Sequence, residues 1–164
     1  MALAKIGKKV TDIKLAATGN QILQLSDFRG KKIVLYFYPK DSTPGCTLEG
    51  QDFRDNKRKF SARNTIVLGV SRDSVKSHEN FKGKQSFSFD LLSDPDEKLC
   101  RQFDVIKEKN MYGRKVVGIE RSTFLIDEKG LLIKEWRKVK VKSHVEEILE
   151  EIKQSAKPAL RGKN

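Results

Sequence analysis

The chain has 164 residues, 37% of them hydrophobic and 34% charged, and its 34 basic and 22 acidic residues give a formal net charge of +12. These values fit one globular domain with a well-solvated surface. Two cysteines are too few for a disulfide scaffold, and no stretch approaches the roughly 20 apolar residues that a membrane-spanning helix needs. Since Lys5 also interrupts the first apolar run, we expect no signal peptide and a cytoplasmic protein with reduced thiols.

The first half of the chain alternates apolar runs with helix-start signals. Residues 33–38 are continuously apolar, which is typical of a central strand that is covered on both faces. Leu48, Phe53 and Phe60 recur at helical spacing among charged residues. The predicted elements are a strand at 22–25, a strand at 32–38, a helix at 46–62, a strand at 65–71, and a helix that Ser74 caps and that runs to about Lys84.

The second half of the chain predicts a hairpin between two further helices. Pro95 lies between two aspartates, and this is a helix-start signal because proline suits the first helical position. The predicted elements are a strand at 89–92, a helix that starts at 93–96 and carries Cys100, strands at 122–126 and 131–136, and a last helix with a capping box of Ser143 and Glu146. This order predicts an α/β, thioredoxin-like sandwich with a central mixed β-sheet flanked by helices.

Cys46 is the best candidate for a reactive nucleophile. It follows Pro44-Gly45 at the predicted start of a helix, where the helix dipole and the backbone N–H groups favour a thiolate. Thr43 can turn its hydroxyl toward the same point, and Pro39 can shield the pocket from water. A buried, inert cysteine is the alternative, because free cysteine is among the most buried residue types. The position of Cys46 at a strand-to-helix junction, outside any apolar run, favours the reactive interpretation.

Three separated blocks of sequence carry a family resemblance. Pro39, Thr43 and Cys46 match Pro-x-x-x-Thr-x-x-Cys, the pattern of peroxiredoxin active sites. The longer stretch Phe37-Tyr-Pro-Lys-Asp-Ser-Thr-Pro-Gly-Cys-Thr-Leu-Glu49 is similar to the peroxiredoxin Q, or bacterioferritin comigratory protein, subfamily. Two more blocks resemble it, Leu91-Leu-Ser-Asp-Pro-Asp96 and Arg121-Ser-Thr-Phe-Leu-Ile-Asp127, so the resemblance runs from near residue 5 to near residue 153.

The resemblance implies a thiol-dependent peroxidase without cofactor or metal, which reduces hydrogen peroxide and organic hydroperoxides. In this scheme Cys46 attacks the O–O bond and becomes a sulfenic acid, Thr43 binds the peroxide, and Pro39 shields the sulfenate. Arg121 stabilises the thiolate and polarises the peroxide, which suits a guanidinium that stays charged and donates several hydrogen bonds. Glu49 orients the arginine in relatives, although an acid in the first helical turn also favours the dipole without any catalytic role.

The chain departs from the subfamily at Gln51, where many members carry a second cysteine. A thiol must condense with the sulfenic acid to restore the enzyme, and Cys100 is the only internal candidate. A disulfide needs Cα atoms within about 7 Å, so the Cys46 helix would have to unwind. Cys100 is more simply explained as a small buried side chain. We therefore expect a one-cysteine mechanism with an external thiol (thioredoxin, glutaredoxin or glutathione, or dithiothreitol), and the alternative is an atypical two-cysteine peroxidase that uses Cys100.

Other residues suggest functions of different classes. A thioredoxin-type disulfide reductase needs Cys-x-x-Cys, but Thr43 stands where the first cysteine would be. His78 and His144 are too few for a zinc cluster with two distant cysteines, and we expect both to be partly exposed structural residues. Asp94 and Asp96 flank Pro95, where helix capping explains them without carboxylate chemistry.

Basic residues gather at 107–115, 134–142 and 157–163, and the second stretch contains Trp136. Such a surface can attract nucleic acid or other anions, so a basic-surface binding protein is the alternative of a different class. Charge on loops and tails more often only keeps a chain soluble, and we expect Trp136 in the core or at a sheet edge. The predicted organisation is one domain at 1–155 and a basic, flexible tail at 156–164. The expected partners are a peroxide and a thiol reductant, with no membrane or nucleic acid, and the resemblance implies a monomer.

Overall fold

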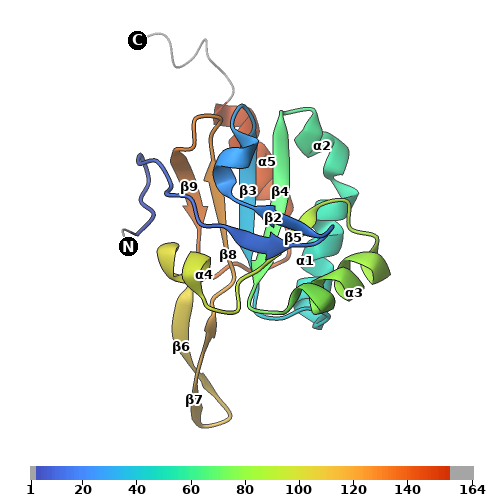
Figure 1. The fold of residues 1–164 in the computed structure, drawn as a ribbon, viewed down its shortest axis with the longest axis vertical. Coiled ribbons are helices and arrows are strands. Elements are labelled where there is room, and N and C mark those ends of the chain that lie inside the picture. Colours follow the sequence, from blue (N-terminus) through green and yellow to red (C-terminus); the bar gives the residue numbers. More distant parts are fainter. Residues whose placement is uncertain (1–2, 156–164) are drawn as a thin grey trace.

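A computed structural model describes residues 3–155 of the chain (Figure 1). Its strands are β1 (Leu15–Ala17), β2 (Gln21–Leu23), β3 (Lys32–Phe37), β4 (Thr65–Ser71), β5 (Asp90–Ser93), β6 (Ile106–Met111), β7 (Arg114–Ile119), β8 (Ser122–Ile126) and β9 (Leu132–Trp136). Its helices are the 3-10 helix η1 (Leu25–Phe28), α1 (Pro44–Asp55), α2 (Lys57–Ser61), α3 (Val75–Gln85), α4 (Lys98–Gln102) and α5 (His144–Ser155). Within this part of the chain, no helix has the length and apolar character to cross a membrane.

A mixed sheet of seven strands organises the molecule, in the order β2-β1-β5-β4-β3-β8-β9. β3 pairs parallel with β4 and antiparallel with β8, so it lies inside the sheet as its apolar sequence predicted. The five predicted strands from 32 onward correspond to β3, β4, β5, β8 and β9 within one residue at each end. The expected central mixed sheet is therefore confirmed, and Trp136 ends its edge strand β9 as predicted.

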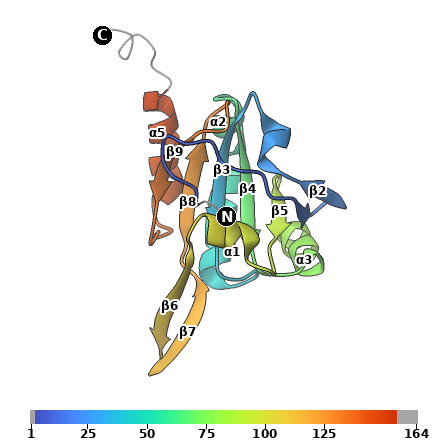
Figure 2. The same cartoon turned by 60° about the vertical axis from the view of Figure 1, so that its left-hand side comes forward.

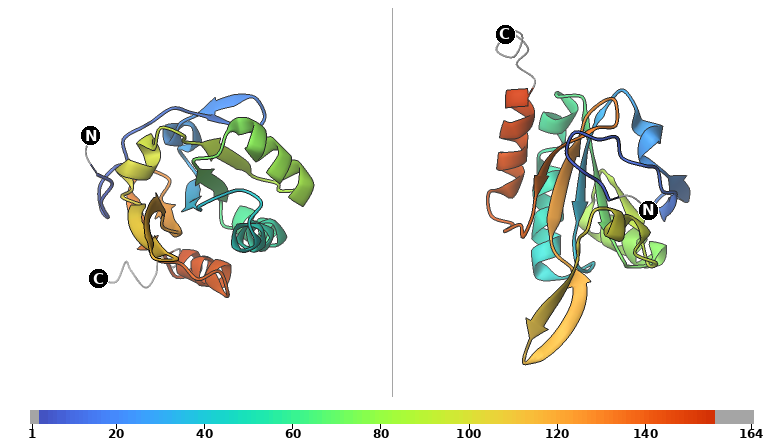
Figure 3. Two further views of the ribbon diagram at one scale, coloured as in Figure 1. Left: turned by 90° about the horizontal axis from the view of Figure 1, so that it is seen from below. Right: turned by 90° about the vertical axis from the view of Figure 1, so that its left-hand side faces the viewer.

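Alternate residues of β3 supply two hydrophobic cores, one on each face of the sheet, because successive strand side chains point in opposite directions. The first, called here the α4 core, includes Leu35, Phe37, Cys100 and Phe103. The second, called the α1 core, includes Tyr36, Tyr38, Cys46 and Phe53, together with residues of α3 and α5. Figure 3 shows α1 and α5 against one face, with α4 and the N-terminal segment on the other. Cys46 and Cys100 therefore belong to different faces of the sheet.

β6 and β7 form a separate two-stranded hairpin that projects away from the body of the molecule (Figure 2). The sequence does not predict this hairpin, because residues 107–115 stand out there only as a basic stretch. Val116 and Val117 are exposed, so neither face of the hairpin carries the apolar alternation of a core strand. The available signal was Tyr112-Gly113, since both residues take positive φ values (54° and 79°) in the two-residue turn.

The predicted helix at 46–62 is wrong in both its start and its continuity. α1 already begins at Pro44, and Asn56 separates it from α2. The Asn56 side chain donates to the Asp52 carbonyl at 2.7 Å, a local bond that competes with regular helical bonding. The N-terminal prediction was also incomplete, because β1 was missed and the strand at 22–25 is split between β2 and η1.

Two predicted helix starts also need correction. α4 begins at Lys98 rather than beside Pro95, and Glu97 precedes it with a left-handed backbone. Asp94 still serves this helix, because its carboxylate accepts hydrogen bonds from the backbone N–H groups of Lys98 (2.9 Å) and Cys100 (2.7 Å). At α5, Ser143 has a φ of 64°, which is not the extended backbone that the predicted capping box uses. The predicted cap of α3 is confirmed, since the Ser74 side chain accepts from the backbone N–H of Ser77.

The packing of α1 against the segment after α3 leads to a prediction about Gly50. A Cβ at this position would collide with the Phe87 ring, 2.8 Å from its Cε1 atom. Overpacking of this kind typically costs about 1–3 kcal/mol, so Gly50→Ala should lower the free energy of unfolding by that amount. The matched control is Gly83→Ala in α3, where nothing lies within 4 Å of the added Cβ. It should raise stability by roughly 0.5–1 kcal/mol. Equal urea-unfolding free energies for the two variants would contradict this packing.

Candidate active site

The loop between β3 and α1 delivers Cys46 to the first turn of a helix. Thr43 is the N-cap residue, with an extended backbone, and Pro44 occupies the start of the helix. The first backbone N–H groups of a helix have no partners within it, and they favour negative charge nearby. Cys46 thus lies where the sequence predicted, and only 2% of it is exposed.

The pairing of β3 with β8 brings Arg121 to this loop. Phe37, at the end of β3, lies opposite Ser122, so the preceding residue Arg121 stands where the chain leaves β3. Arg121 Nη2 donates to Cys46 Sγ at 3.5 Å, and Arg121 Nη1 donates to Glu49 Oε1 at 2.6 Å. One guanidinium therefore connects the thiol to a buried carboxylate one helical turn further along α1.

Gly45 makes room for this guanidinium. A Cβ at this position would lie 3.2 Å from Arg121 Nη2, which is closer than side chains usually pack. Glycine at 45 therefore lets Arg121 approach the start of α1 closely. The sequence had suggested Gly45 only as part of the helix start, so this steric role is an addition.

Burial and charge act in opposite directions within the Arg121–Glu49 pair. Burial raises the pKa of Glu49 from 4.5 to about 7, although Arg121 acts to lower it. Burial disfavours the charge on Arg121, but Glu49 and Cys46 raise the pKa of the guanidinium above its ordinary value. Glu49 Oε2 is buried without a hydrogen-bond partner among the described residues. The raised pKa keeps the arginine cationic beside the thiol, whereas burial brings the pKa of Glu49 close to neutral.

Thr43 and Pro39 flank the same loop and are both half-buried. The Thr43 hydroxyl donates to the Lys40 carbonyl at 2.8 Å, which uses its only hydrogen. Its oxygen is still able to accept a hydrogen bond from an incoming O–H group. Pro39 has no N–H and therefore adds no competing donor to the loop.

Cys100 is buried in the α4 core, on the face of the sheet opposite Cys46. Burial raises its pKa far above the ordinary value, and Asp94 adds to the effect. Cys100 is thus a poor nucleophile in this environment. Gln51, where the subfamily often has a second cysteine, donates from its side chain to Gln85 Oε1 at 3.0 Å.

Both histidines are buried, so the expectation that they would be partly exposed is wrong. His144 Nε2 lies 2.8 Å from Thr123 Oγ1, and burial lowers the pKa of His144 to about 4, against the effect of Glu147. His78 contacts Asp41, the middle residue of the loop between Pro39 and Thr43. Sequence reasoning missed Asp41, because an acidic residue in a polar loop gives no sign of where its side chain points.

Residues 6–135 match the profile of the AhpC/TSA family. Peroxiredoxin Bcp of Xanthomonas campestris pv. campestris is 52% identical over 156 residues, which cover 95% of this chain and 98% of that protein. Peroxiredoxin Bcp of Bacillus subtilis is 52% identical over 149 residues, covering 91% of this chain and 95% of that protein. A solved structure of Xanthomonas campestris bacterioferritin comigratory protein, studied for its alkyl peroxide reduction activity, has a TM-score of 0.87 and 51% identity, covering 96% of this chain and 100% of that chain. The predicted thioredoxin-like sandwich is confirmed by this likeness.

The titration of Glu49 leads to a prediction about stability and pH. Because folding raises its pKa, the protonated form is favoured in the folded state, and this contribution is lost as the pH rises from 4.5 toward about 7. Between about pH 5 and pH 8 the wild type should therefore lose roughly 2 kcal/mol relative to Glu49→Gln, which has no carboxylate to ionise. Urea unfolding at the two pH values measures this difference.

The matched control for that experiment is Glu150→Gln, which removes an exposed glutamate from α5. Its stability relative to the wild type should change little between the two pH values. If the difference between the wild type and Glu49→Gln were also independent of pH, Glu49 would not titrate as its burial implies.

Proposed function

The chain belongs to the AhpC/TSA family and is a thiol-dependent peroxidase of the peroxiredoxin Bcp (Q) kind, and we propose that it works through Cys46 alone, with an external thiol as reductant. Peroxiredoxins use thiol reductants and need no prosthetic cofactor. The proposed substrates are hydrogen peroxide and organic hydroperoxides. The alkyl peroxide reduction studied in the Xanthomonas campestris relative supports the organic class.

In the oxidative half-reaction, Cys46 Sγ attacks one oxygen of the peroxide and the O–O bond breaks. The attacked oxygen keeps its hydrogen and becomes part of a sulfenic acid on Cys46. The other oxygen leaves as hydroxide or alkoxide and takes a proton from solvent, which yields water or an alcohol. Arg121, 3.5 Å from the sulfur, would stabilise the negative charge as it moves from sulfur to the leaving oxygen. Thr43 Oγ1 would accept the peroxide O–H, and Pro39 would keep water from the sulfenate.

In the reductive half-reaction, an external thiol condenses with the sulfenic acid and water leaves. A second thiol then attacks the mixed disulfide, which returns Cys46 and releases the oxidised reductant. The observation that carries the one-cysteine proposal is the placement of Cys46 and Cys100 in cores on opposite faces of the sheet. A disulfide between them needs Cα atoms within about 7 Å, so one residue would have to leave its core.

The setting and partners of the enzyme follow from the same chemistry. Cys46 and Cys100 are both free thiols, which fits a reducing compartment such as the cytoplasm. The proposed reductants are thioredoxin, glutaredoxin or glutathione, with dithiothreitol as a laboratory substitute. We infer a monomer in which residues 1–155 form the single domain. The proposed tail at 156–164 lies outside the described residues.

The role of Cys46 is tested by peroxide consumption with dithiothreitol in two variants. Cys46→Ser should lose nearly all activity, because serine is not a comparable nucleophile at neutral pH. Cys100→Ser should stay close to the wild type, since it changes a buried side chain on the other face of the sheet. Equal consumption by the wild type and Cys46→Ser would refute catalysis by this thiol. Loss of turnover in a folded Cys100→Ser would instead favour the two-cysteine alternative.

A further inference from the structure

Asp41 points into the protein from an exposed loop. Its neighbours Lys40 and Ser42 are exposed, whereas only 2% of the Asp41 side chain is accessible. Ser42 has a φ of 64°, a left-handed backbone that residues other than glycine adopt at a cost. Interactions elsewhere must compensate for this conformation, and Asp41 is the loop residue that is placed to supply them.

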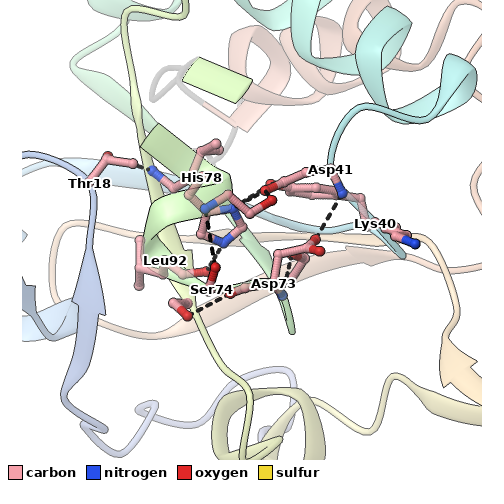
Figure 4. Close-up of polar contacts among 12 residues, drawn as sticks. Thr18, Lys40, Asp41, Asp73, Ser74, His78 and Leu92 are labelled. Carbon is pink, nitrogen blue, oxygen red and sulfur yellow. Dashed lines mark hydrogen bonds and ion pairs between the residues drawn. The ribbon is translucent and has the colours of Figure 1, made fainter. Parts of the chain in front are cut away.

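The Asp41 carboxylate accepts hydrogen bonds from the residue that follows β3 and from α3 (Figure 4). Tyr38, just after β3, donates its hydroxyl to Oδ1 at 2.6 Å. From the first turns of α3, Ser77 Oγ lies 2.8 Å and His78 Nδ1 lies 2.7 Å from Oδ2. The carboxylate thus fastens the middle of the loop to β3 and to α3.

His78 extends this connection to the sheet. Its Nε2 lies 2.9 Å from the carbonyl oxygen of Leu92 in β5, and because a carbonyl only accepts, Nε2 carries a hydrogen. Nδ1 then faces the Asp41 carboxylate, so a proton lies between these two atoms in a charge-assisted hydrogen bond. Both side chains are buried, and leaving either partner unpaired there would be costly.

Asp73 also holds the loop between β3 and α1 in place, by a hydrogen bond to its backbone. Its Oδ2 accepts the backbone N–H of Asp41 at 2.8 Å and the Ser71 hydroxyl at 2.6 Å. Ligand-type atoms of Asp41, Asp73 and His78 all lie within 4.8 Å of one another, as they would around a metal ion. The hydrogen bonds already engage these atoms, so the network explains the cluster without a cation.

We propose that Asp41 and His78 are a positioning pair, which holds the loop at residues 39–43, the proposed peroxide-binding loop, in its position beside Cys46. This inference rests on the proposed function of Cys46. Asp41 is two residues from Pro39 and two from Thr43, so it fixes the centre of the segment that carries both. Neither member of the pair contacts Cys46 Sγ in the described hydrogen bonds, so they act through the loop. A displacement of about 1 Å in such a segment can lower a rate by roughly a hundredfold.

The experiment compares two reactions of the same thiol. It uses a Cys100→Ser background, in which Cys46 is the one cysteine left to react. Single-turnover oxidation by hydrogen peroxide requires the loop geometry, whereas alkylation by iodoacetamide requires only an accessible thiolate. The variants are Asp41→Ala, His78→Ala and the conservative Asp41→Asn, each measured at a temperature where its thermal unfolding curve shows a folded protein. The matched control is Asp94→Ala, which removes another buried carboxylate, one that serves α4 and not this loop.

Asp41→Ala and His78→Ala should lower the ratio of the peroxide rate to the alkylation rate at least about tenfold. Asp41→Asn should recover most of this loss, because its amide can donate to a neutral His78 Nδ1 and still accept from Tyr38. Asp94→Ala should keep the wild-type ratio. If an alanine variant does not fold, Tyr38→Phe provides the same test, with an expected fall of about threefold from the loss of one hydrogen bond.

The proposal is overturned if the folded Asp41→Ala and His78→Ala variants keep the wild-type ratio of rates. It is also overturned if Asp41→Asn lowers this ratio as much as Asp41→Ala, or if the control Asp94→Ala lowers it as much as Asp41→Ala. Failure of the underlying peroxidase function would be visible separately, because the reference protein itself would then not react with peroxide.

Discussion

The hydrogen-bonded pair of the partly buried Arg121 and the fully buried Glu49 is the constraint on which the rest of the site depends. A charge taken from water must be paired, and removing one partner of a buried pair typically costs about 3–5 kcal/mol. The 2.6 Å bond to Glu49 therefore fixes the guanidinium, and its other nitrogen can then meet Cys46 Sγ. The register of β3 with β8 places Arg121 at the loop between β3 and α1, and Gly45 leaves the space that the guanidinium occupies.

The sheet separates the two cysteines, and this separation shapes the proposed catalytic cycle. Cys46 packs with the α1 core and Cys100 with the α4 core. The hydrogen bond of Gln51 to Gln85, and that of Arg54 to the Gln85 carbonyl, tie α1 to the end of α3. These contacts favour a folded α1, whereas an internal disulfide would require part of the helix to unwind. An external thiol that reaches the sulfenic acid needs no such rearrangement.

The sequence predicted those features that depend on local pattern. The continuously apolar β3, the Ser74 cap and the presence of a helix at Cys46, although not its first residue, all leave signals within a few residues. Arg121 lies 75 residues from Cys46, so only the family resemblance could connect them. The Asp41–His78 contact was not predictable, because a loop aspartate and a helical histidine 37 residues apart carry no shared pattern. The β6–β7 hairpin was missed for a different reason: only its base, at Ile106 and Ile119, packs on the α4 core, while Val116 and Val117 further along are exposed, so its strands show no apolar alternation.

The most direct test of the one-cysteine account is the intact mass of the fully reduced wild-type protein after one equivalent of hydrogen peroxide. Cys46 sulfenic acid adds one oxygen atom to the chain, and the account predicts this gain, located by peptide mapping to the segment that contains Cys46. A loss of two hydrogen atoms, with a linked peptide pair containing Cys46 and Cys100, would contradict it. That result would mean that one of the two buried cysteines leaves its side of the sheet during the cycle.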